Sequence, residues 1–245
     1  ANILPNYGVE VDFIDAADNN AWEKSFKQNT KVVFLESPAN PNLELADISH
    51  IANLCKANNS FLIVDNIFAT PLCQSPLELG ADAVIYSTTK HMDGQGRTLG
   101  GAVIGSENFI KETLLPFHRH TGPALSPFNA WIVTKSLETF ALRYDYHVKN
   151  AKKIAEFLES HKKIAEVIYP GLESHPQYHL AKKQMRSGGA MIAFKVKGSK
   201  AECFTFVNKL EIIDISNNLG DSRSLITHPA TTTHSNIAEE ERDML

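Results

Sequence analysis

A lysine and two hydroxyl residues end an apolar run, directly before a stretch rich in glycine. The run reads "DAVIYSTTKHMDGQGRTLGG" over residues 82–101 and places Ser87, Thr89 and Lys90 ahead of the glycines. Because side chains alternate along an extended chain, the Ser87 and Thr89 hydroxyls are predicted to face the same way. Two hydroxyls, an amine and glycine backbone amides suit an anionic, phosphate-like group. The alternative is a strand end with two turn-forming hydroxyl residues and a surface lysine.

A carboxylate ends a second apolar run, "FLIVDN" at residues 61–66. Asp65 follows "FLIV" directly, and an ionised carboxylate in such a place needs a partner because burying an unpaired charge is costly. Two interpretations of this residue remain open. Asp65 is either a helix cap or turn acceptor, or the counter-ion of a bound cation.

One cofactor needs all of these groups together. Pyridoxal 5'-phosphate (PLP) needs a lysine that bonds to its aldehyde, a carboxylate that keeps its ring nitrogen protonated, and hydroxyls and backbone N–H groups for its phosphate. Lys90 is the candidate catalytic residue, and Asp65, Ser87 and Thr89 are the candidate cofactor ligands. Glycines after Lys90 let the backbone approach the ring or the phosphate without a Cβ clash. A lysine that also acts as a base needs a pKa below the ordinary value of about 10.4.

Motifs for other chemistries fit less well. "GQGRTLGG" differs from the dinucleotide motif G-x-G-x-x-G because Leu99 occupies the position of the third glycine. The sequence contains neither G-x-x-x-x-G-K-[ST] nor G-x-S-x-G, and no histidine pair has metal-ligand spacing with a carboxylate. We therefore predict no metal site, and the alternative of a generic nucleotide-binding α/β domain lacks its phosphate-binding fingerprint.

The first part of the chain alternates between short β-rich runs and helical runs. Strands are predicted at residues 9–15, 31–37, 61–66, 82–88 and 100–105, and helices at 21–26 and 47–59. Strands that are apolar on both faces and separated by helices predict a central, mostly parallel sheet with helices on both sides. Ligands bind at the carboxyl ends of the strands in such sheets, which would bring Asp65 and Lys90 to one edge.

The second part begins with a long helical pattern over residues 126–163. The segments after it predict a smaller α+β unit, with a helix at 200–209. We place the domain boundary near residue 146, which gives a PLP-binding large domain at 1–146 and a C-terminal small domain at 147–245, each of them partial.

Composition excludes several classes of partner. The 245 residues carry 24 basic and 28 acidic side chains, a formal net charge of −4, so nucleic acid and membrane are poor partners. No apolar stretch is long enough to span a bilayer. Cys55, Cys73 and Cys203 are widely spaced, which predicts free thiols in a reducing compartment, the cytoplasm.

The order of motifs "ESPANP…IVDNIFATP…GADAVIYSTTKHMDGQGRTLGG…THPATTTHS" resembles the Cys/Met-metabolism (transsulfuration) family of PLP-dependent enzymes. The resemblance implies an α/β fold of fold-type I, with a seven-stranded sheet, a smaller C-terminal α+β domain and a homotetramer made of two dimers. It implies that Lys90 bonds to the cofactor, that Asp65 contacts its ring nitrogen, and that Ser87 and Thr89 bind its phosphate. Asn40 resembles an asparagine that contacts the cofactor and the substrate carboxylate, and Ser224 a serine at the substrate end. Asn40 as a turn residue and Ser224 as a strand start remain alternatives.

The segment "DGQGR" after Lys90 is similar to the O-succinylhomoserine sulfhydrylase branch of this family. The branch implies replacement at the γ-carbon of O-succinylhomoserine by sulfide, which gives homocysteine for methionine synthesis. Cystathionine γ-synthase or γ-lyase activity is the alternative within the family.

The family also has upstream and downstream segments with further tyrosines and arginines that this sequence does not contain. We therefore expect a fragment that lacks both ends. It starts "ANILPNYG" without an initiator methionine and stops in a predicted helix capped by Ser235 or Asn236. A non-catalytic fragment is the alternative of another class.

Overall fold

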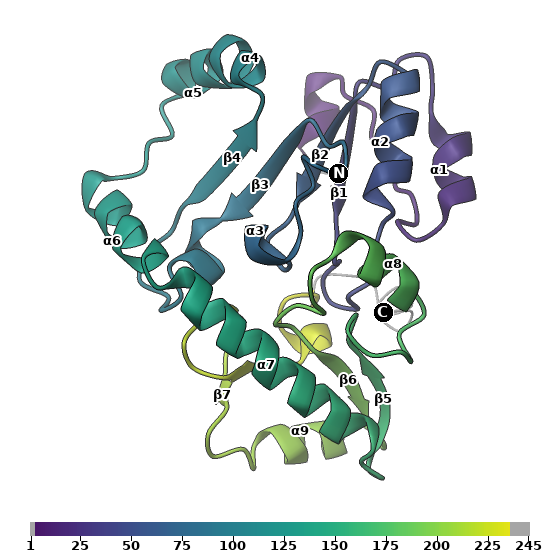
Figure 1. Cartoon of the computed structure of the whole chain (residues 1–245), viewed down its shortest axis with the longest axis vertical. Coiled ribbons are helices and arrows are strands. Elements are labelled where there is room, and N and C mark those ends of the chain that lie inside the picture. Colours follow the sequence, from purple (N-terminus) through teal and green to yellow (C-terminus); the bar gives the residue numbers. More distant parts are fainter. Residues whose placement is uncertain (1–2, 236–245) are drawn as a thin grey trace.

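The structure is a computed structural model that describes residues 3–235 (Figure 1). A sheet lies in the upper part of Figure 1, a smaller unit lies below it, and the long helix α7 (Phe140–Glu159) runs between them. The helix predicted to follow Ser235 lies outside the described residues. No described helix is long and apolar enough to cross a membrane.

The main sheet contains four strands in the order β1-β2-β3-β4. These strands are β1 (Val32–Glu36), β2 (Phe61–Asp65), β3 (Ala83–Ser87) and β4 (Gly101–Gly105). The β1–β2 and β2–β3 pairs are parallel and the β3–β4 pair is antiparallel. The predicted mostly parallel sheet is therefore confirmed, and four of its predicted strands are present.

The prediction of a strand at residues 9–15 is wrong. These residues form no strand, and the Phe13 side chain is 81% exposed. Alternation of apolar and polar residues favours an extended chain, but a strand also needs a neighbouring backbone to bond with. Within the described part of the chain, no ladder partner lies beside this segment.

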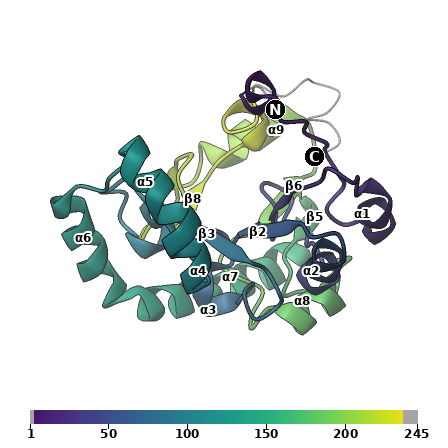
Figure 2. The ribbon, with the colours of Figure 1, turned by 90° about the horizontal axis from the view of Figure 1, so that it is seen from above.

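One face of the sheet lines a buried hydrophobic cluster. Helix α2 (Ile48–Ala57) begins at Asp47, whose side chain accepts a hydrogen bond from His50 N, and it packs its buried side against alternate residues of β1 and β2. The contacted sheet residues include Leu62 and Val64, both fully buried. Figure 2 shows α2, α3 (Thr70–Cys73) and α7 on one side of β2 and β3.

The opposite face carries Phe109 of α4 (Glu107–Phe109) against Phe61 of β2, with ring centroids 4.8 Å apart, but it is open at β1. Val32 and Phe34 are 54% and 57% exposed, although Val33 and Leu35, which alternate with them, are buried. The run is apolar on both faces, but in the described chain only one face of this strand is covered.

The predicted helical segment at 126–163 consists of two helices, α6 (Pro127–Leu137) and α7, with a break at Glu138 and Thr139. The carbonyl of Ser136 at the end of α6 accepts a hydrogen bond from the Arg143 side chain, so this end of α6 is tied to α7. Helix α7 continues through residue 146 without a break. The domain boundary near this residue therefore stays a prediction, placed inside a helix.

The C-terminal unit combines short strands and helices, as predicted. Strand β5 (Ile164–Ile168) pairs antiparallel with β6 (Ala193–Val196), and β7 (Asp214–Ile215) pairs parallel with β8 (Leu225–Ile226).

The remaining helices and turns come from all parts of the described chain. They are α1 (Asn19–Ser25), α4 (Glu107–Phe109), α5 (Leu115–Thr121), α8 (Tyr178–Gln184), α9 (Lys200–Val207), the 3-10 turns η1 (Leu4–Tyr7) and η4 (Pro229–Thr231), and the π-helical turns η2 (Thr88–Met92) and η3 (Ile110–Leu114).

Candidate active site

Three polar side chains share one face at the carboxyl ends of adjacent strands. Glu36 on β1 lies opposite Asp65 on β2, and Asp65 lies opposite Ile85 on β3. Ser87 follows Ile85 by two residues, so that its side chain returns to the same face. The expected convergence at this sheet edge is therefore present, and Lys90 follows directly in the turn after β3.

Asp65 is a half-buried carboxylate with one backbone partner. Its Oδ1 accepts a hydrogen bond from Ile67 N at 3.0 Å, and burial raises the pKa of the carboxyl while this bond lowers it. Among residues 3–235, no basic side chain forms an ion pair with Asp65. A cation brought to this edge would therefore find a carboxylate available.

The strand end that carries Asp65 is fixed by a buried amide network. Asn66 is fully buried, and its Nδ2 donates to the Gln74 carbonyl at 2.9 Å and to the Tyr86 hydroxyl at 3.0 Å. Gln74 Nε2 donates in turn to Asn66 Oδ1 at 2.9 Å. Because Tyr86 belongs to β3, the network joins the ends of the two strands that carry Asp65 and Ser87.

Lys90 lies in η2, where its backbone angles (φ −87°, ψ −126°) interrupt the helical turn. Its Nζ donates a hydrogen bond of 2.8 Å to Asn218 Oδ1 in the C-terminal unit. Burial lowers the pKa of the Lys90 amine, in the direction that a base requires. Asn218 is a partner that sequence reasoning missed, because no local motif marks an amide so distant along the chain.

Ser87 and Thr89 do not face the same way along an extended chain, so that part of the prediction is wrong. Strand β3 ends at Ser87 and the helical turn begins at Thr88. The Thr89 hydroxyl accepts from Gly100 N at 3.0 Å and tethers the turn to the residue before β4. The hydroxyl of Ser87 makes no hydrogen bond with any described residue. The neighbouring Thr88 hydroxyl is buried, and it too has no hydrogen-bond partner among the described residues.

The two remaining predicted residues lie at the surface. Asn40 is in the turn after β1, at the same sheet edge, and its N–H donates to Glu36 Oε2 at 3.4 Å. Ser224 stands just before β8, and its carbonyl accepts from Asp214 N at 3.0 Å. Ser224 makes no hydrogen bond to the described residues around Lys90. Its role stays a prediction.

Glu36 is a second carboxylate that sequence reasoning missed. Burial, followed by repulsion from Asp65, raises its pKa to about 7. The signal was present in "KVVFLES", because the glutamate ends an apolar strand whose neighbour ends in aspartate.

An open pocket of about 560 Å³ lies beside Lys90. It is rich in amide and hydroxyl side chains and contains no carboxylate. The lining residues are Thr89, Lys90, Gly96, Arg97, Thr98, Leu99, Asn129, Asn217 and Asn218. Within residues 3–235 no group of histidine, cysteine and acidic residues could hold a metal ion.

These groups fit PLP. The half-buried amine of Lys90 suits the aldehyde, the unpaired carboxylate of Asp65 suits the ring nitrogen, and the free hydroxyl of Ser87 suits the phosphate. The mostly parallel sheet and the groups at this edge define the class as α/β PLP-dependent enzymes of fold-type I.

Comparison with known proteins agrees with that class. The whole chain, residues 1–245, matches the family described as Cys/Met metabolism PLP-dependent enzyme, and the chain belongs to this family. It is 47% identical to O-succinylhomoserine sulfhydrylase of Mycobacterium tuberculosis strain H37Rv, over 99% of this chain and 61% of the relative. It is 43% identical to L-methionine γ-lyase of Fusobacterium nucleatum subsp. polymorphum, over 98% of this chain and 61% of that relative. The family model and these relatives confirm the family resemblance and the PLP chemistry of the family.

The structure of cystathionine γ-lyase from Lactobacillus plantarum in complex with L-serine superposes with a TM-score of 0.94 and 35% identity. The match covers 99% of this chain and 63% of that one, and it confirms the fold class. The chain thus spans about three fifths of the length of these relatives.

Proposed function

We propose that the protein containing this chain is a PLP-dependent transferase that replaces the γ-substituent of an activated homoserine ester. O-Succinylhomoserine and sulfide would give homocysteine and succinate. The names of the sulfhydrylase relatives and the "DGQGR" segment support this substrate pair. The observation that carries the proposal is the half-buried Lys90 amine, with its lowered pKa, in the turn after the strand next to Asp65.

The bound cofactor would supply a positively charged ring that withdraws electrons from the substrate carbon next to the amine. Lys90 Nζ accepts the proton from the substrate α-carbon, and its lowered pKa increases the neutral fraction of the amine at a given pH. Asp65 balances the charge of the ring nitrogen, because the carboxylate is half-buried and free of basic partners in the described chain.

The remaining predicted residues bind and orient. Ser87 and Thr89 hold the phosphate, and the Gly100 amide bonded to Thr89 fixes the direction of that hydroxyl. Asn40 binds the cofactor ring hydroxyl and the substrate carboxylate from the turn after β1. Ser224 completes the substrate end from the C-terminal unit.

The experiment that tests this proposal is covalent trapping. The chain is incubated with PLP, reduced with borohydride and digested, and the modified peptide is identified by mass spectrometry. We expect the adduct on Lys90, and we expect Lys90→Ala to abolish it. Lys111→Ala, which removes an exposed surface lysine, is the matched control and should keep the adduct. An adduct spread over surface lysines, unchanged in Lys90→Ala, would reject the assignment.

A second reaction within the family is elimination, which the lyase names of two relatives favour. Incubation of the whole protein with O-succinylhomoserine, alone and with sulfide or cysteine, separates the alternatives. Homocysteine formed only with sulfide supports the sulfhydrylase, and cystathionine formed with cysteine indicates a γ-synthase. Release of 2-oxobutyrate without a sulfur donor indicates a lyase.

A non-catalytic fragment is the alternative of another class. It rests on the share of its relatives that the chain spans. Absence of a borohydride-trappable PLP adduct at Lys90 of this chain would favour this alternative.

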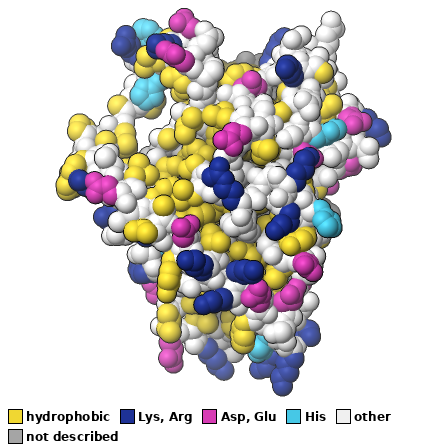
Figure 3. Space-filling model, viewed as in Figure 1, with side chains coloured by type: hydrophobic (Ala, Val, Ile, Leu, Met, Phe, Trp, Pro, Cys, Tyr) yellow, Lys and Arg dark blue, Asp and Glu magenta, His cyan; other side chains and the backbone are white. Residues whose placement is uncertain are grey.

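We also propose a homotetramer in the cytoplasm. Large apolar side chains are exposed on α5, α6 and α7, on the side where hydrophobic surface gathers in Figure 3. These side chains include Phe117, Phe128, Trp131 and Leu142, exposed by 65%, 65%, 58% and 74%. An exposed apolar group of this kind marks an interaction surface. The three free thiols are consistent with a reducing compartment. Sedimentation of the whole protein tests the assembly, and a monomer at micromolar concentration would contradict it.

A further inference from the structure

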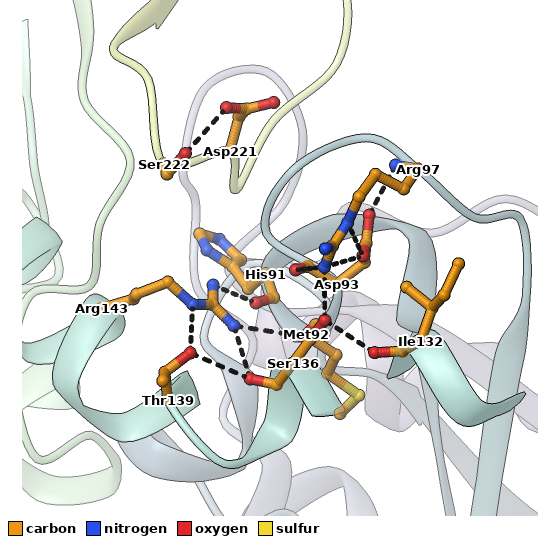
Figure 4. A network of polar contacts seen from close by, with 10 residues as sticks. All are labelled: His91, Met92, Asp93, Arg97, Ile132, Ser136, Thr139, Arg143, Asp221 and Ser222. Carbon is orange, nitrogen blue, oxygen red and sulfur yellow. Dashed lines mark hydrogen bonds and ion pairs between the residues drawn. The ribbon is translucent and has the colours of Figure 1, made fainter. Parts of the chain in front are cut away.

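The turn that carries Lys90 leaves two backbone carbonyls for a side chain to satisfy. Asp93 N donates to the Thr88 carbonyl at 2.9 Å, and Gly94 N donates to the Lys90 carbonyl at 2.8 Å. The carbonyls of His91 and Met92 point instead to Arg143 (Figure 4). Helix ends generally leave carbonyls without intrahelical partners. Here the guanidinium of an arginine on another helix donates hydrogen bonds to both carbonyls.

Arg143 reaches these carbonyls from α7. Its Nη1 donates to the His91 carbonyl at 2.9 Å, and its Nη2 donates to the Met92 carbonyl at 3.2 Å. The same guanidinium is anchored by the Ser136 carbonyl at 3.0 Å and the Thr139 hydroxyl at 3.2 Å. A planar fork with fixed donors can serve several acceptors at once, which a lysine cannot reproduce.

Gly94 provides the space for this guanidinium. A Cβ on Gly94 would lie 1.9 Å from Arg143 Nη1 and 2.5 Å from its Cζ, and the backbone there is left-handed (φ +70°). Both facts restrict the position to glycine as long as Arg143 keeps its place. The first glycine of "DGQGR" therefore has a local structural reason.

A second tie holds the other side of the same loop. Asp93 is fully buried, and its carboxylate pairs with Arg97 Nη2 at 2.8 Å. The same Arg97 nitrogen donates to the Ser136 hydroxyl at 2.6 Å. Figure 4 shows that both arginines meet at Ser136, so the end of α6 is joined to the loop on both sides of Gly94.

We propose that Arg143 is a positioning residue for Lys90, holding the two carbonyls after Lys90 so that the turn presents the amine toward Asn218 and the pocket. The inference rests on the proposed role of Lys90. Arg143 contacts the backbone carbonyls of the two residues that follow Lys90, and it does not contact the Lys90 amine. Without it the His91 and Met92 carbonyls lose their protein partners, the chain after Lys90 is released, and the amine becomes more solvated.

The test measures the Lys90 amine directly, without cofactor. Competitive acetylation with acetic anhydride over a range of pH, read by peptide mass spectrometry, gives the titration midpoint of Lys90 in the parent and each variant. We expect a midpoint below that of an ordinary lysine in the parent. In Arg143→Met and in Gly94→Ala it should rise toward about 10.4 as the amine is solvated. Arg143→Lys keeps the positive charge but loses the forked guanidinium. The Lys90 midpoint in this variant should therefore be raised above the parent value, as in Arg143→Met.

Borohydride trapping with PLP supplies a second readout. The rate of adduct formation at Lys90 should fall roughly 10- to 100-fold in Arg143→Met, as it does when a reacting group is misplaced by about 1 Å. The double variant with Gly94→Ala should lose no more than the single one, because both remove the same contacts. Tyr169→Phe removes a buried hydrogen bond to the Gly189 carbonyl in the C-terminal unit. This variant is the control for a loss of stability that does not affect the site. It should leave the titration midpoint of Lys90 and the rate of adduct formation at Lys90 unchanged.

The outcomes separate this inference from the proposed function. Parent values for midpoint and rate in both Arg143→Met and Gly94→Ala would overturn the positioning role and leave Lys90 as the cofactor lysine. Full recovery in Arg143→Lys would also overturn it, since charge alone would then suffice. An absence of specific trapping in the parent would overturn the proposed function, together with the inference that rests on it.

Discussion

The raised pKa of Glu36 predicts that the stability of the folded chain depends on pH. Its pKa of about 7 lies well above the usual value of 4.5, because burial and the neighbouring Asp65 both disfavour the ionised form. The folded chain therefore binds the Glu36 proton more tightly than the unfolded chain does. The resulting stability is fully present below about pH 4.5 and is lost as the pH rises through about 7.

The size of the effect follows from the two pKa values. At about 1.4 kcal/mol for each tenfold change in proton affinity, the ionised glutamate destabilises the folded chain by roughly 3 kcal/mol above neutral pH. Glu36→Gln keeps the shape and an acceptor for Asn40 N, and it removes the charge. We expect this variant to be more stable than the parent by up to roughly 3 kcal/mol at pH 8, and by less than about 1 kcal/mol at pH 5.

Urea unfolding at pH 5 and pH 8, without cofactor, measures the difference. Glu138→Gln removes a charge from an exposed pair with Lys135, and it should change stability by less than about 0.5 kcal/mol at either pH. If Glu36→Gln gave the same small change at pH 8, the carboxylate would be well solvated and the reasoning from its burial would be refuted.

Three further substitutions test the supports of the site, and urea unfolding measures each. Asn66→Ala removes the amide that joins β2 to β3 and should cost about 3 kcal/mol, since it leaves buried polar groups unpaired. A cost below about 1 kcal/mol would contradict that network. Gly220→Ala puts a Cβ 2.4 Å from His91 N and should cost about 1–3 kcal/mol and release Asn218 from Lys90. A neutral result would show that the loop adapts. Tyr144→Phe removes a 2.7 Å bond to the Ala69 carbonyl and should cost about 1 kcal/mol, and unchanged stability would assign that bond no net value.

The sheet and its polar edge could be predicted because their signals are local. Runs such as "FLIVDN" combine a continuous apolar stretch with a polar end, and parallel pairing then brings Asp65 next to the strand that leads to Lys90. The strand predicted at 9–15 alternates apolar and polar residues, which favours an extended chain, but pairing depends on a neighbour that no local pattern specifies. The direction of Thr89 was wrong because the strand ends two residues earlier than the hydroxyl pattern required.

The surroundings of Lys90 could not be predicted, because they come from distant parts of the chain. Asn218 meets the lysine from the C-terminal unit, and Arg143 meets the following carbonyls from α7. No spacing in the sequence links these residues to the segment around Lys90. Their roles depend on how helices and loops are packed, and this is settled only in three dimensions.

The hydrogen bond between Lys90 and Asn218 also constrains the order of events during biosynthesis. The two residues are 128 positions apart. At a ribosomal elongation rate of about 5–20 residues per second, the amide is added roughly 6 to 26 s after the lysine. Throughout that interval the Lys90 amine lacks the Asn218 amide to which it is bonded in the folded chain. This bond can therefore form only after the chain has been extended by 128 residues beyond the lysine, however early the first strands assemble.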